Sequence, residues 1–177
     1  MTFSIKTFNR HEDRSIAELH SKCIKTGFLS ILPPSFLASL YRAIAKDKDS
    51  IVLTIGGQDS ACYGFVAGTC STKNLYKRVL IRKWPSFIIR ILPLAIKPNF
   101  LRKIFETLLY PFYVNPAKID YNKCEDTEAE LLSIAVKDST RRRGLGRLLV
   151  SHLDSWFTAK DCSQYSVVTA ANDEDSN

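Results

Sequence analysis

The chain has 177 residues, of which 45% are hydrophobic and 24% charged. These values are typical of one globular domain and exclude a disordered chain. Its five cysteines are odd in number, no two stand at CxxC spacing, and the three histidines lie far from any cysteine pair. This pattern favours free thiols in a reducing cytosol over a disulfide framework or a zinc site, so no metal is expected. The sequence has neither a signal-peptide pattern nor an apolar run of about 18 residues, which predicts a cytoplasmic location.

The formal net charge of +7 comes from one segment. Between Thr72 and Lys118 the sequence contains ten Lys or Arg and one acidic residue, Glu106, which leaves a net charge of −2 for the remainder. The same segment holds five of the seven prolines and no glycine. It predicts a basic insert, residues 72–118, made of two or three short helices that break near the prolines.

Before this insert the pattern predicts a strand, two helices and a β-hairpin. Apolar residues recur every three or four positions in the helical segments, and they alternate or cluster in the strands. The expected elements are a strand at 4–8, helices from Arg10 to about Thr26 and from Ser35 to about Lys46, and strands at Ser50–Ile55 and Cys62–Cys70. Gly64 and Gly68 indicate a bulge or close packing in the last of these strands.

After the insert the pattern predicts a strand, a turn, a helix and a final strand. These elements are expected at Ala129–Val136, Lys137–Gly144, Gly146 to about Ala159, and Gln164–Ala170. The resulting order, β-α-α-β-β-insert-β-α-β, predicts an α+β fold in a single domain that covers residues 1–177.

The turn before the last helix has the features of an anion site. Gly144 and Gly146 allow the backbone to bend sharply and to approach a ligand closely. The first amides of the following helix lack intrahelical acceptors, and together with the helix dipole they attract an anion such as a pyrophosphate. Nearby arginines add positive charge and have donors that match phosphate oxygens; they are Arg141, Arg142, Arg143 and Arg147.

The turn does not match two common phosphate-binding motifs. The P-loop pattern GxxxxGK[ST] is absent, and the dinucleotide pattern GxGxxG fails because no third glycine follows Gly146. By physical reasoning alone, a basic turn before an ordinary helix remains an alternative.

The stretch Arg141-Arg142-Arg143-Gly144-Leu145-Gly146 resembles the cofactor signature [RQ]-x-x-G-x-[GA] of the GNAT superfamily of acyl-CoA N-acyltransferases. It stands between the strand LLSIAV and the helix RLLVSHL, and the order of elements before it is similar too. The resemblance implies a mixed, mainly antiparallel sheet flanked by helices. It also implies acetyl-CoA as cosubstrate, with no metal, and direct attack of a primary amine on the thioester.

The resemblance also implies roles for particular residues. The backbone of Ile134, Ala135 and Val136 would pair with the pantetheine arm, and an amide near Ile134 would polarise the thioester carbonyl. The amides and side chains of the turn would hold the pyrophosphate; these residues are Arg141, Arg142, Arg143, Gly144, Leu145, Gly146 and Arg147. Asn172 matches an asparagine that contacts the cofactor in relatives.

A protonated amine cannot attack, so a general base is needed, directly or through water. Glu130 stands at the start of the strand before the turn, where relatives keep a carboxylate, and it is the expected base, with Glu128 second. The alternative for Glu130 is a solvated charge at a strand end. His20 and His152 are expected to be packed or surface histidines rather than catalytic ones.

The sequence departs from the family pattern at its C-terminal end. After Asn172 the family continues through a helix with a tyrosine that protonates the departing thiolate, and then two more strands. Here the sequence stops at Asn177, and Tyr165 does not stand where it could replace that tyrosine. We expect that the C-terminal part of the fold is missing, that a partner chain completes the sheet, or that the protein binds CoA with little turnover. A homodimer is a separate expectation.

The basic insert allows more than one interpretation and does not identify the acceptor. Its pattern is similar to GNAT-type proteins associated with bacterial surface polysaccharide synthesis, which implies an amino sugar or a nucleotide-linked amino sugar. An alternative is an amphipathic anchor at the inner membrane face, which neutralising Lys77, Arg78, Arg82 and Lys83 would release. A solvated basic surface is the third alternative. No nucleic-acid motif accompanies the charge, so nucleic-acid binding is not expected.

Overall fold

The computed structural model describes residues 3–25, 28–57, 61–79 and 127–169. Within them the chain forms one mixed sheet in the order β1-β2-β3-β4-β5. The strands are β1 (Ser4–Thr7), β2 (Ser50–Gly56), β3 (Cys62–Thr69), β4 (Glu130–Val136) and β5 (Ser166–Val167). The pairs from β1 to β4 are antiparallel, and β4 pairs with β5 in parallel. The predicted α+β class and the predominantly antiparallel sheet are confirmed.

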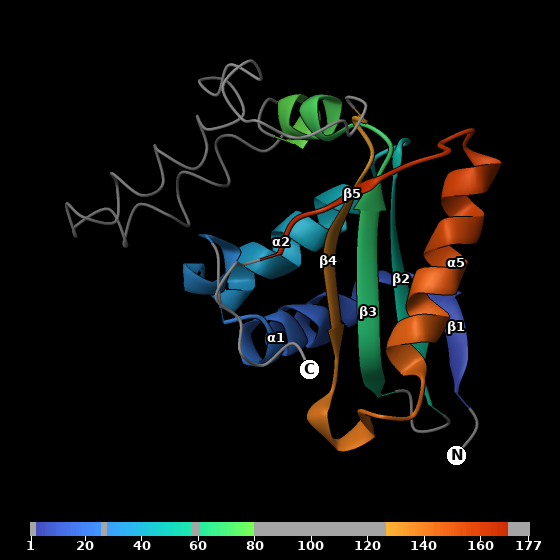
Figure 1. Ribbon diagram of the computed structural model, residues 1–177. Helices are drawn as coiled ribbons and strands as arrows, with labels where there is room; N and C mark the ends of the chain where they lie inside the picture. The colour runs from blue at the N-terminus through green and yellow to red at the C-terminus, as the bar shows by residue number, and fades with distance from the viewer. Residues whose placement is uncertain (1–2, 26–27, 58–60, 80–126, 170–177) are drawn as a thin grey trace, which may run out of the picture.

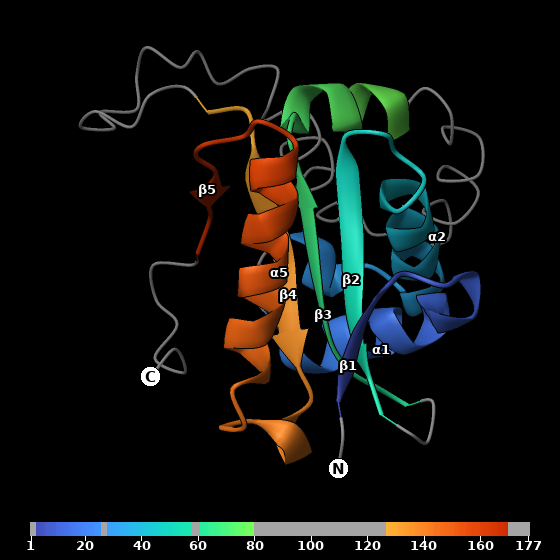
Figure 2. The same ribbon diagram turned by 90° about the vertical axis from the view of Figure 1, so that its right-hand side faces the viewer.

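Helices cover both faces of this sheet (Figures 1 and 2). One face carries α1 (Asp13–Cys23) and α2 (Pro34–Ile44), which pack with Val52, Phe65 and Ala135 in one buried cluster. The other face carries α5 (Leu145–Ala159), which packs with Leu53, Ile55 and Val66 in a second cluster. The sheet therefore separates two apolar layers. The candidate site described below lies along β4, whose residues pack in both layers.

The close approach of α5 to the sheet depends on a glycine that the sequence singled out. A Cβ atom on Gly68 would lie 2.8 Å from Leu153 Cδ1 and 3.1 Å from the ring of Phe157. The register between β3 and β4 also shifts between Ala67 and Gly68. The predicted close packing at this glycine is therefore confirmed, whereas the extra residue of the bulge lies in the facing strand β4 and not in β3.

Four predicted helix boundaries differ from the structure by one to three residues. The first predicted helix begins as a 3-10 turn at Arg10–Glu12, because the side chains of Asn9 and Glu12 bond each other's backbone amides. It ends at Cys23 instead of Thr26, since Ile24 turns to an extended conformation and packs on the first cluster. The second ends at Ile44 instead of Lys46, and it begins at Pro34 because proline suits the first helical position.

The last strand is much shorter than predicted. The prediction covered Gln164–Ala170, whereas β5 consists of Ser166 and Val167, which pair with Glu130 and Leu131. Beyond this contact β5 diverges from β4, and Val168 is exposed. Ala170 and Asn172 lie outside the described residues.

Of the predicted insert, only the first residues are described. Residues 72–79 form a helix at the end of β3, coloured green in Figure 1. The predicted short helices beyond residue 79, and with them most of the basic segment, lie outside the described residues.

Candidate functional site: an anion pocket and a carboxylate at opposite ends of β4

A bulge in β4 organises the site. Opposite Ala67 and Gly68 of β3, the register of β4 jumps from Leu131 to Ser133, so Leu132 is the extra residue. The bulge interrupts the alternation of side chains: Leu132 packs in the α1–α2 cluster, and the next residue, Ser133, lies on the same face, where it accepts a hydrogen bond from Tyr41 of α2. A bulge of this kind bends a strand and re-aims its backbone groups.

Beyond the bulge, one edge of β4 has no strand beside it in the described residues. Lys137 N donates to Tyr63 O at 2.8 Å, so residue 137 faces β3, and by alternation Ala135 faces β3 as well. The amides and carbonyls of Ile134 and Val136 therefore point to the opposite edge, where Cys23 Sγ donates to Val136 O at 3.7 Å. In the described part of the chain, no strand pairs with β4 there beyond Leu131.

The turn after β4 uses two left-handed residues. Gly144 has φ 77° and stands at the N-cap of α5, and Arg142 has φ 61°. A left-handed conformation is ordinary for glycine but costs about 1–2 kcal/mol for a residue with a Cβ. The first bond of α5 runs from Leu148 N to Gly144 O at 3.0 Å, so the amides of Leu145, Gly146 and Arg147 have no intrahelical acceptor. The turn thus presents several donors in one direction.

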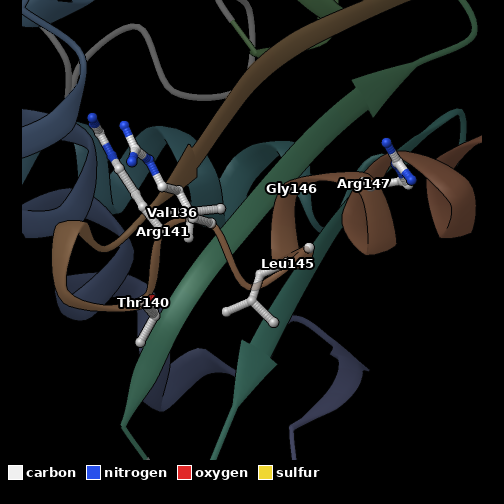
Figure 3. Close-up of a pocket in the computed structure, with 8 residues that line it drawn as sticks. Val136, Thr140, Arg141, Leu145, Gly146 and Arg147 are labelled. Carbon is white, nitrogen blue, oxygen red and sulfur yellow. The ribbon is translucent and has the colours of Figure 1, made fainter. Parts of the chain in front are cut away.

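A pocket of about 660 Å³ lies at this turn (Figure 3). Its volume is within the ~300–1,000 Å³ range of small-molecule sites. It is lined by Val136, Thr140, Arg141, Arg142, Gly144, Leu145, Gly146 and Arg147. Arg141 is bonded to Asp138 at 2.9 Å, but both side chains are more than half exposed, so this pair neutralises the pocket little.

The structure brings most of the predicted cofactor residues together. The strand end and the turn meet in one pocket, as the local order strand–turn–helix required. Arg143 is exposed and does not line the pocket, and Asn172 lies outside the described residues. Ala135 lines the β3 side of the strand rather than the open edge.

Glu130 lies at the other end of β4. Its Oε2 accepts a hydrogen bond of 3.0 Å from the Thr72 hydroxyl, which comes from the helix at 72–79. Burial raises the pKa of Glu130, and the Thr72 hydrogen bond opposes this in part. Glu130 in turn contributes to the raised pKa of Tyr76, whose larger cause is burial. Glu130 is therefore not the fully solvated strand-end charge that the sequence left as an alternative.

Thr72 and Tyr76 are site residues that the sequence did not indicate. They stand more than fifty positions before Glu130, and neither belongs to a motif. Only the pairing of β3 with β4 places the end of β3, and so the helix that follows it, beside Glu130.

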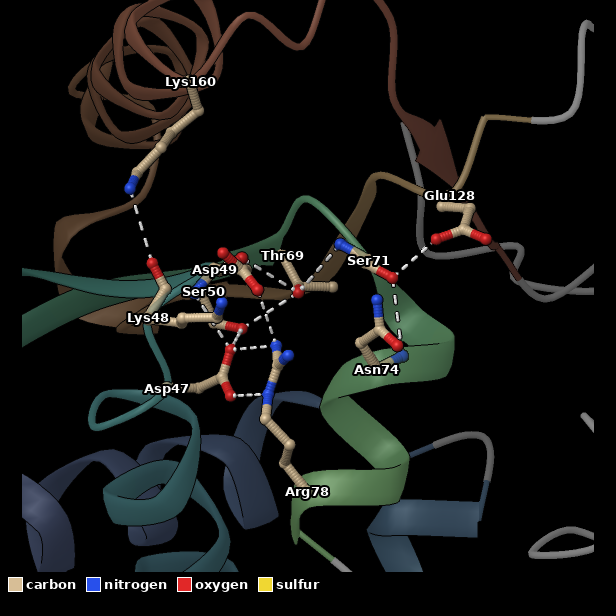
Figure 4. Close-up of polar contacts among 10 residues, drawn as sticks. All are labelled: Asp47, Lys48, Asp49, Ser50, Thr69, Ser71, Asn74, Arg78, Glu128 and Lys160. Atoms are coloured by element: carbon tan, nitrogen blue, oxygen red, sulfur yellow. Dashed lines mark hydrogen bonds and ion pairs between the residues drawn. The ribbon is translucent and has the colours of Figure 1, made fainter.

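Ion pairs fix this helix to the sheet (Figure 4). Arg78 Nη2 lies 2.8 Å from Asp47 Oδ1 and 2.9 Å from Asp49 Oδ2, both in the turn before β2. Burial acts to raise the pKa of Asp47, but hydrogen bonds from Arg78, Asp49 N and Ser50 outweigh it, and the pKa lies below its usual value. Arg78 was predicted as one of the cations of a membrane anchor, whereas the structure engages it within the protein.

Glu128, the second candidate base, is held differently. It accepts a 2.6 Å hydrogen bond from the Ser71 hydroxyl and lies 3.7 Å from Lys73, and its side chain is 47% exposed. Its environment is close to that of an ordinary surface carboxylate. Glu130 differs in being partly buried, and this burial raises its pKa.

The histidines, the cysteines and the helices add further observations. His152 is exposed and lies 3.0 Å from Leu148 O on its own helix, whereas His20 is buried, so both predicted settings are confirmed. Cys23, Cys62, Cys70 and Cys162 are free thiols.

Residues 3–25, 28–57, 61–79 and 127–169 contain no group of three potential metal ligands. None of the helices in these ranges is long and apolar enough to cross a membrane.

Comparisons with known proteins agree with this geometry. Residues 109–176 match the model of the acetyltransferase (GNAT) family, a region that includes β4, the turn and α5. The region is less than half of the chain. No curated protein matches the chain.

Solved structures match over nearly the whole chain. An aminoglycoside antibiotic 6'-N-acetyltransferase, AAC(6')-Ih from Acinetobacter baumannii, has a TM-score of 0.59 at 12% identity, covering 99% of this chain and 84% of its own. AAC(6')-Iy, in complex with a bisubstrate analog of CoA and acetylneamine, has a TM-score of 0.59 at 14% identity, covering 98% and 83%. The ribosomal-protein-S18-alanine N-acetyltransferase from Escherichia coli has a TM-score of 0.53 at 12% identity, covering 97% and 70%.

These likenesses show that the chain has the fold of GNAT N-acetyltransferases. The matched family and the three proteins named above are all acetyltransferases, so both comparisons return the class of enzyme that the sequence predicted.

Proposed function

We propose that this protein is an N-acetyltransferase that moves the acetyl group of acetyl-CoA to a primary amine by direct attack. The observation that carries the proposal is the course of β4. The strand has a carboxylate of raised pKa at one end, a bulge and an unpaired edge in the middle, and an arginine-lined pocket with free helix amides at the other end.

The two ends of β4 suit the two substrates. The pyrophosphate of CoA would occupy the pocket, where amides of Leu145, Gly146 and Arg147 donate to it. The pantetheine arm would run along the open edge and pair with Ile134 and Val136. The thioester would then lie beside the bulge, where an amide donor can stabilise the oxyanion that forms on attack.

Glu130 is the proposed general base. Its Cα lies about 10–13 Å along the strand from Ile134, at ~3.3 Å per residue, which leaves room for an acceptor amine and a water molecule. The raised pKa brings the carboxylate closer to the working pH of a general base.

For the acceptor we propose an amino sugar or a nucleotide-linked amino sugar. Two of the similar structures are aminoglycoside acetyltransferases, whose acceptors are amino sugars, while the third acts on a ribosomal protein. The acidic side chains Glu128 and Glu130 at this end of β4 favour a cationic acceptor.

We retain a homodimer and a membrane-facing basic segment as further predictions; most of that segment lies outside the described residues.

The first test is calorimetric titration of acetyl-CoA into the purified 177-residue chain, with three variants. Gly144→Glu should abolish binding, because it adds a negative charge and forces a Cβ into the left-handed region. Gly146→Ala should bind within a few-fold of wild type, since its new Cβ would meet Val136 Cγ2 only at 4.0 Å. Ser151→Glu adds the same charge on the exposed face of α5 and should bind normally.

Absence of binding by folded wild-type protein would contradict the proposal. Binding should be followed by a screen of amines that includes an amino sugar, a nucleotide-linked amino sugar and a peptide amino terminus, with release of CoA as the readout. Acetyl-CoA binding without turnover of any amine would favour the CoA-binding module instead.

A further inference from the structure

A buried chain of polar side chains runs from α1 through α2 to the bulge of β4. His20 Nδ1 lies 2.6 Å from the Tyr41 hydroxyl, and that hydroxyl donates to Ser133 Oγ at 3.0 Å. The three side chains come from three elements, and their residues are 1%, 0% and 8% exposed. Polar groups buried this deeply cost stability unless they are satisfied, and a chain of them is a conspicuous feature in an otherwise apolar layer.

One atom of this chain has no partner. His20 Nε2 is buried and has no hydrogen bond within the described part of the structure. Burial lowers the pKa of His20 to about 4, so the imidazole is neutral and carries one proton. A buried N–H without an acceptor is rarer than an unused acceptor, so the proton is assigned to Nδ1.

This tautomer fixes the direction of the chain. His20 Nδ1–H donates to the Tyr41 oxygen, which leaves the Tyr41 proton for Ser133 Oγ. Burial raises the pKa of Tyr41, so the phenol remains protonated and keeps this role at neutral pH. Every donor in the chain therefore points toward β4.

The chain ends on the peptide group that matters for catalysis. Ser133 stands directly after the extra residue of the bulge, and its carbonyl carbon is bonded to the amide nitrogen of Ile134. That amide is the one that would face the thioester. A hydrogen bond that holds the Ser133 side chain to α2 restricts rotation of this peptide group, in a strand segment whose other edge is unpaired.

We infer that His20, Tyr41 and Ser133 are positioning residues that hold the bulge of β4 and aim the Ile134 amide at the thioester carbonyl. This inference rests on the proposed function, because it needs acetyl-CoA on the open edge of β4. The three residues do not touch the reacting atoms and transfer no proton. They act by fixing the direction of a donor whose misplacement weakens carbonyl polarisation.

The test compares Tyr41→Phe and Ser133→Ala with Thr54→Val. Tyr41→Phe removes the hydroxyl and keeps the ring that packs against Phe65. Thr54→Val is the matched control. Thr54 lies on β2, two strands away from β4, and the change removes a fully buried hydroxyl that donates to Glu12. All three changes should lower the urea midpoint of unfolding, because each removes a buried hydrogen bond.

The readout specific to positioning is the carbonyl resonance of acetyl-CoA labelled with ¹³C at the thioester carbon. On binding to wild type and Thr54→Val it should move downfield, as expected for a polarised carbonyl. With Tyr41→Phe and Ser133→Ala the downfield shift should shrink, while the affinity for CoA stays within about twofold because the pocket at the turn is untouched. With an accepting amine, kcat should fall roughly tenfold with little change in KM for acetyl-CoA.

The outcomes separate the two proposals. A full downfield shift in Tyr41→Phe and Ser133→Ala would overturn the positioning role and leave the proposed function intact. An equally reduced downfield shift in Thr54→Val would also overturn it, because the loss of carbonyl polarisation would then reflect only the loss of stability. Failure of folded wild type to bind acetyl-CoA would overturn both. If Tyr41→Phe does not fold, the smaller change Ser133→Ala decides by the same criterion.

Discussion

The two ends of β4 are built in different ways. At its carboxyl end, the strand, the turn and the first turn of α5 are consecutive in the chain, and the described residues that line the pocket all lie between positions 136 and 147. At its amino end, Glu130 is contacted by Thr72, and the helix that carries Thr72 is tied by Arg78 to the turn before β2. The proposed cofactor end is therefore local in sequence, whereas the proposed acceptor end depends on three separate segments. Substitutions should reveal this difference. Binding at the carboxyl end should be impaired only by changes in the turn and its neighbours in the chain, whereas catalysis at the amino end should also respond to changes far from Glu130.

The largest effect that separates the two ends is expected from Glu130→Gln. It should lower kcat by roughly 10²–10⁴-fold, the usual contribution of a general base, and leave acetyl-CoA affinity unchanged. In wild type, kcat/KM should rise with pH as Glu130 ionises, with an apparent pKa above the ordinary glutamate value because burial raises it. Glu130→Gln should lose this rise. The matching substitution Glu128→Gln should retain it, and loss of the rise in that variant instead would move the base to Glu128.

A smaller effect should follow from Arg78→Ala, which acts on the acceptor end from a distance. It leaves the buried carboxylate of Asp47 with hydrogen bonds from Asp49 N and Ser50 only. We expect a loss of about 2–3 kcal/mol in the free energy of unfolding at pH 7, measured with urea, and a lower kcat at unchanged acetyl-CoA affinity. Weaker acetyl-CoA binding would contradict the separation of the two ends.

The pH dependence of this variant has a definite sign. The pKa of Asp47 is depressed in the folded protein, so its stabilising contribution is present above the unfolded-state pKa and is lost as the pH falls through the folded-state value. Arg78→Ala should therefore destabilise the protein less in acid than at pH 7. Lys77→Ala, which removes an exposed cation one position earlier, is the control and should change neither stability nor its pH dependence appreciably.

The smallest effect is expected from Thr72→Val. The Thr72 hydroxyl stabilises the charged form of Glu130, so its loss should raise the pKa of Glu130 further. The rise of kcat/KM with pH should move to higher pH, while the plateau at alkaline pH stays near the wild-type value. Thr158→Val on the exposed face of α5 should leave the profile in place. A shift toward lower pH in Thr72→Val would show that Thr72 does not act on the carboxylate as the geometry indicates.

Much of the fold could be predicted from the sequence, and the misses have local causes. The strand and helix order was correct because period-2 and period-3.6 patterns are encoded residue by residue. The first helix was predicted too long because the capping interaction of Asn9 with Glu12 and the turn at Ile24 interrupt an otherwise helical pattern. The last strand was predicted too long because an apolar run does not reveal that its partner strand diverges after two pairs.

Some features of the candidate site could likewise be predicted from neighbouring residues, whereas others depend on residues distant in the chain. The turn could be found from Gly144, Gly146 and the arginines, since a left-handed N-cap and free helix amides follow from consecutive residues. The exposed position of Arg143 and the internal ion pairs of Arg78 could not be found, because side-chain direction on a turn or a helix depends on what packs against it. Glu130 was found by resemblance, but its raised pKa arises from neighbours distant in the chain.

The sequence by itself thus determined the order of elements and the anion-binding turn, because both are written in short-range patterns of apolar spacing, glycine and charge. The tertiary structure decided which edge of β4 stays open, which carboxylate is buried, and that His20, Tyr41 and Ser133 meet beneath the bulge. These features require segments separated by up to 113 positions to pack together. Desolvation and hydrogen-bond geometry exist only after that packing has formed.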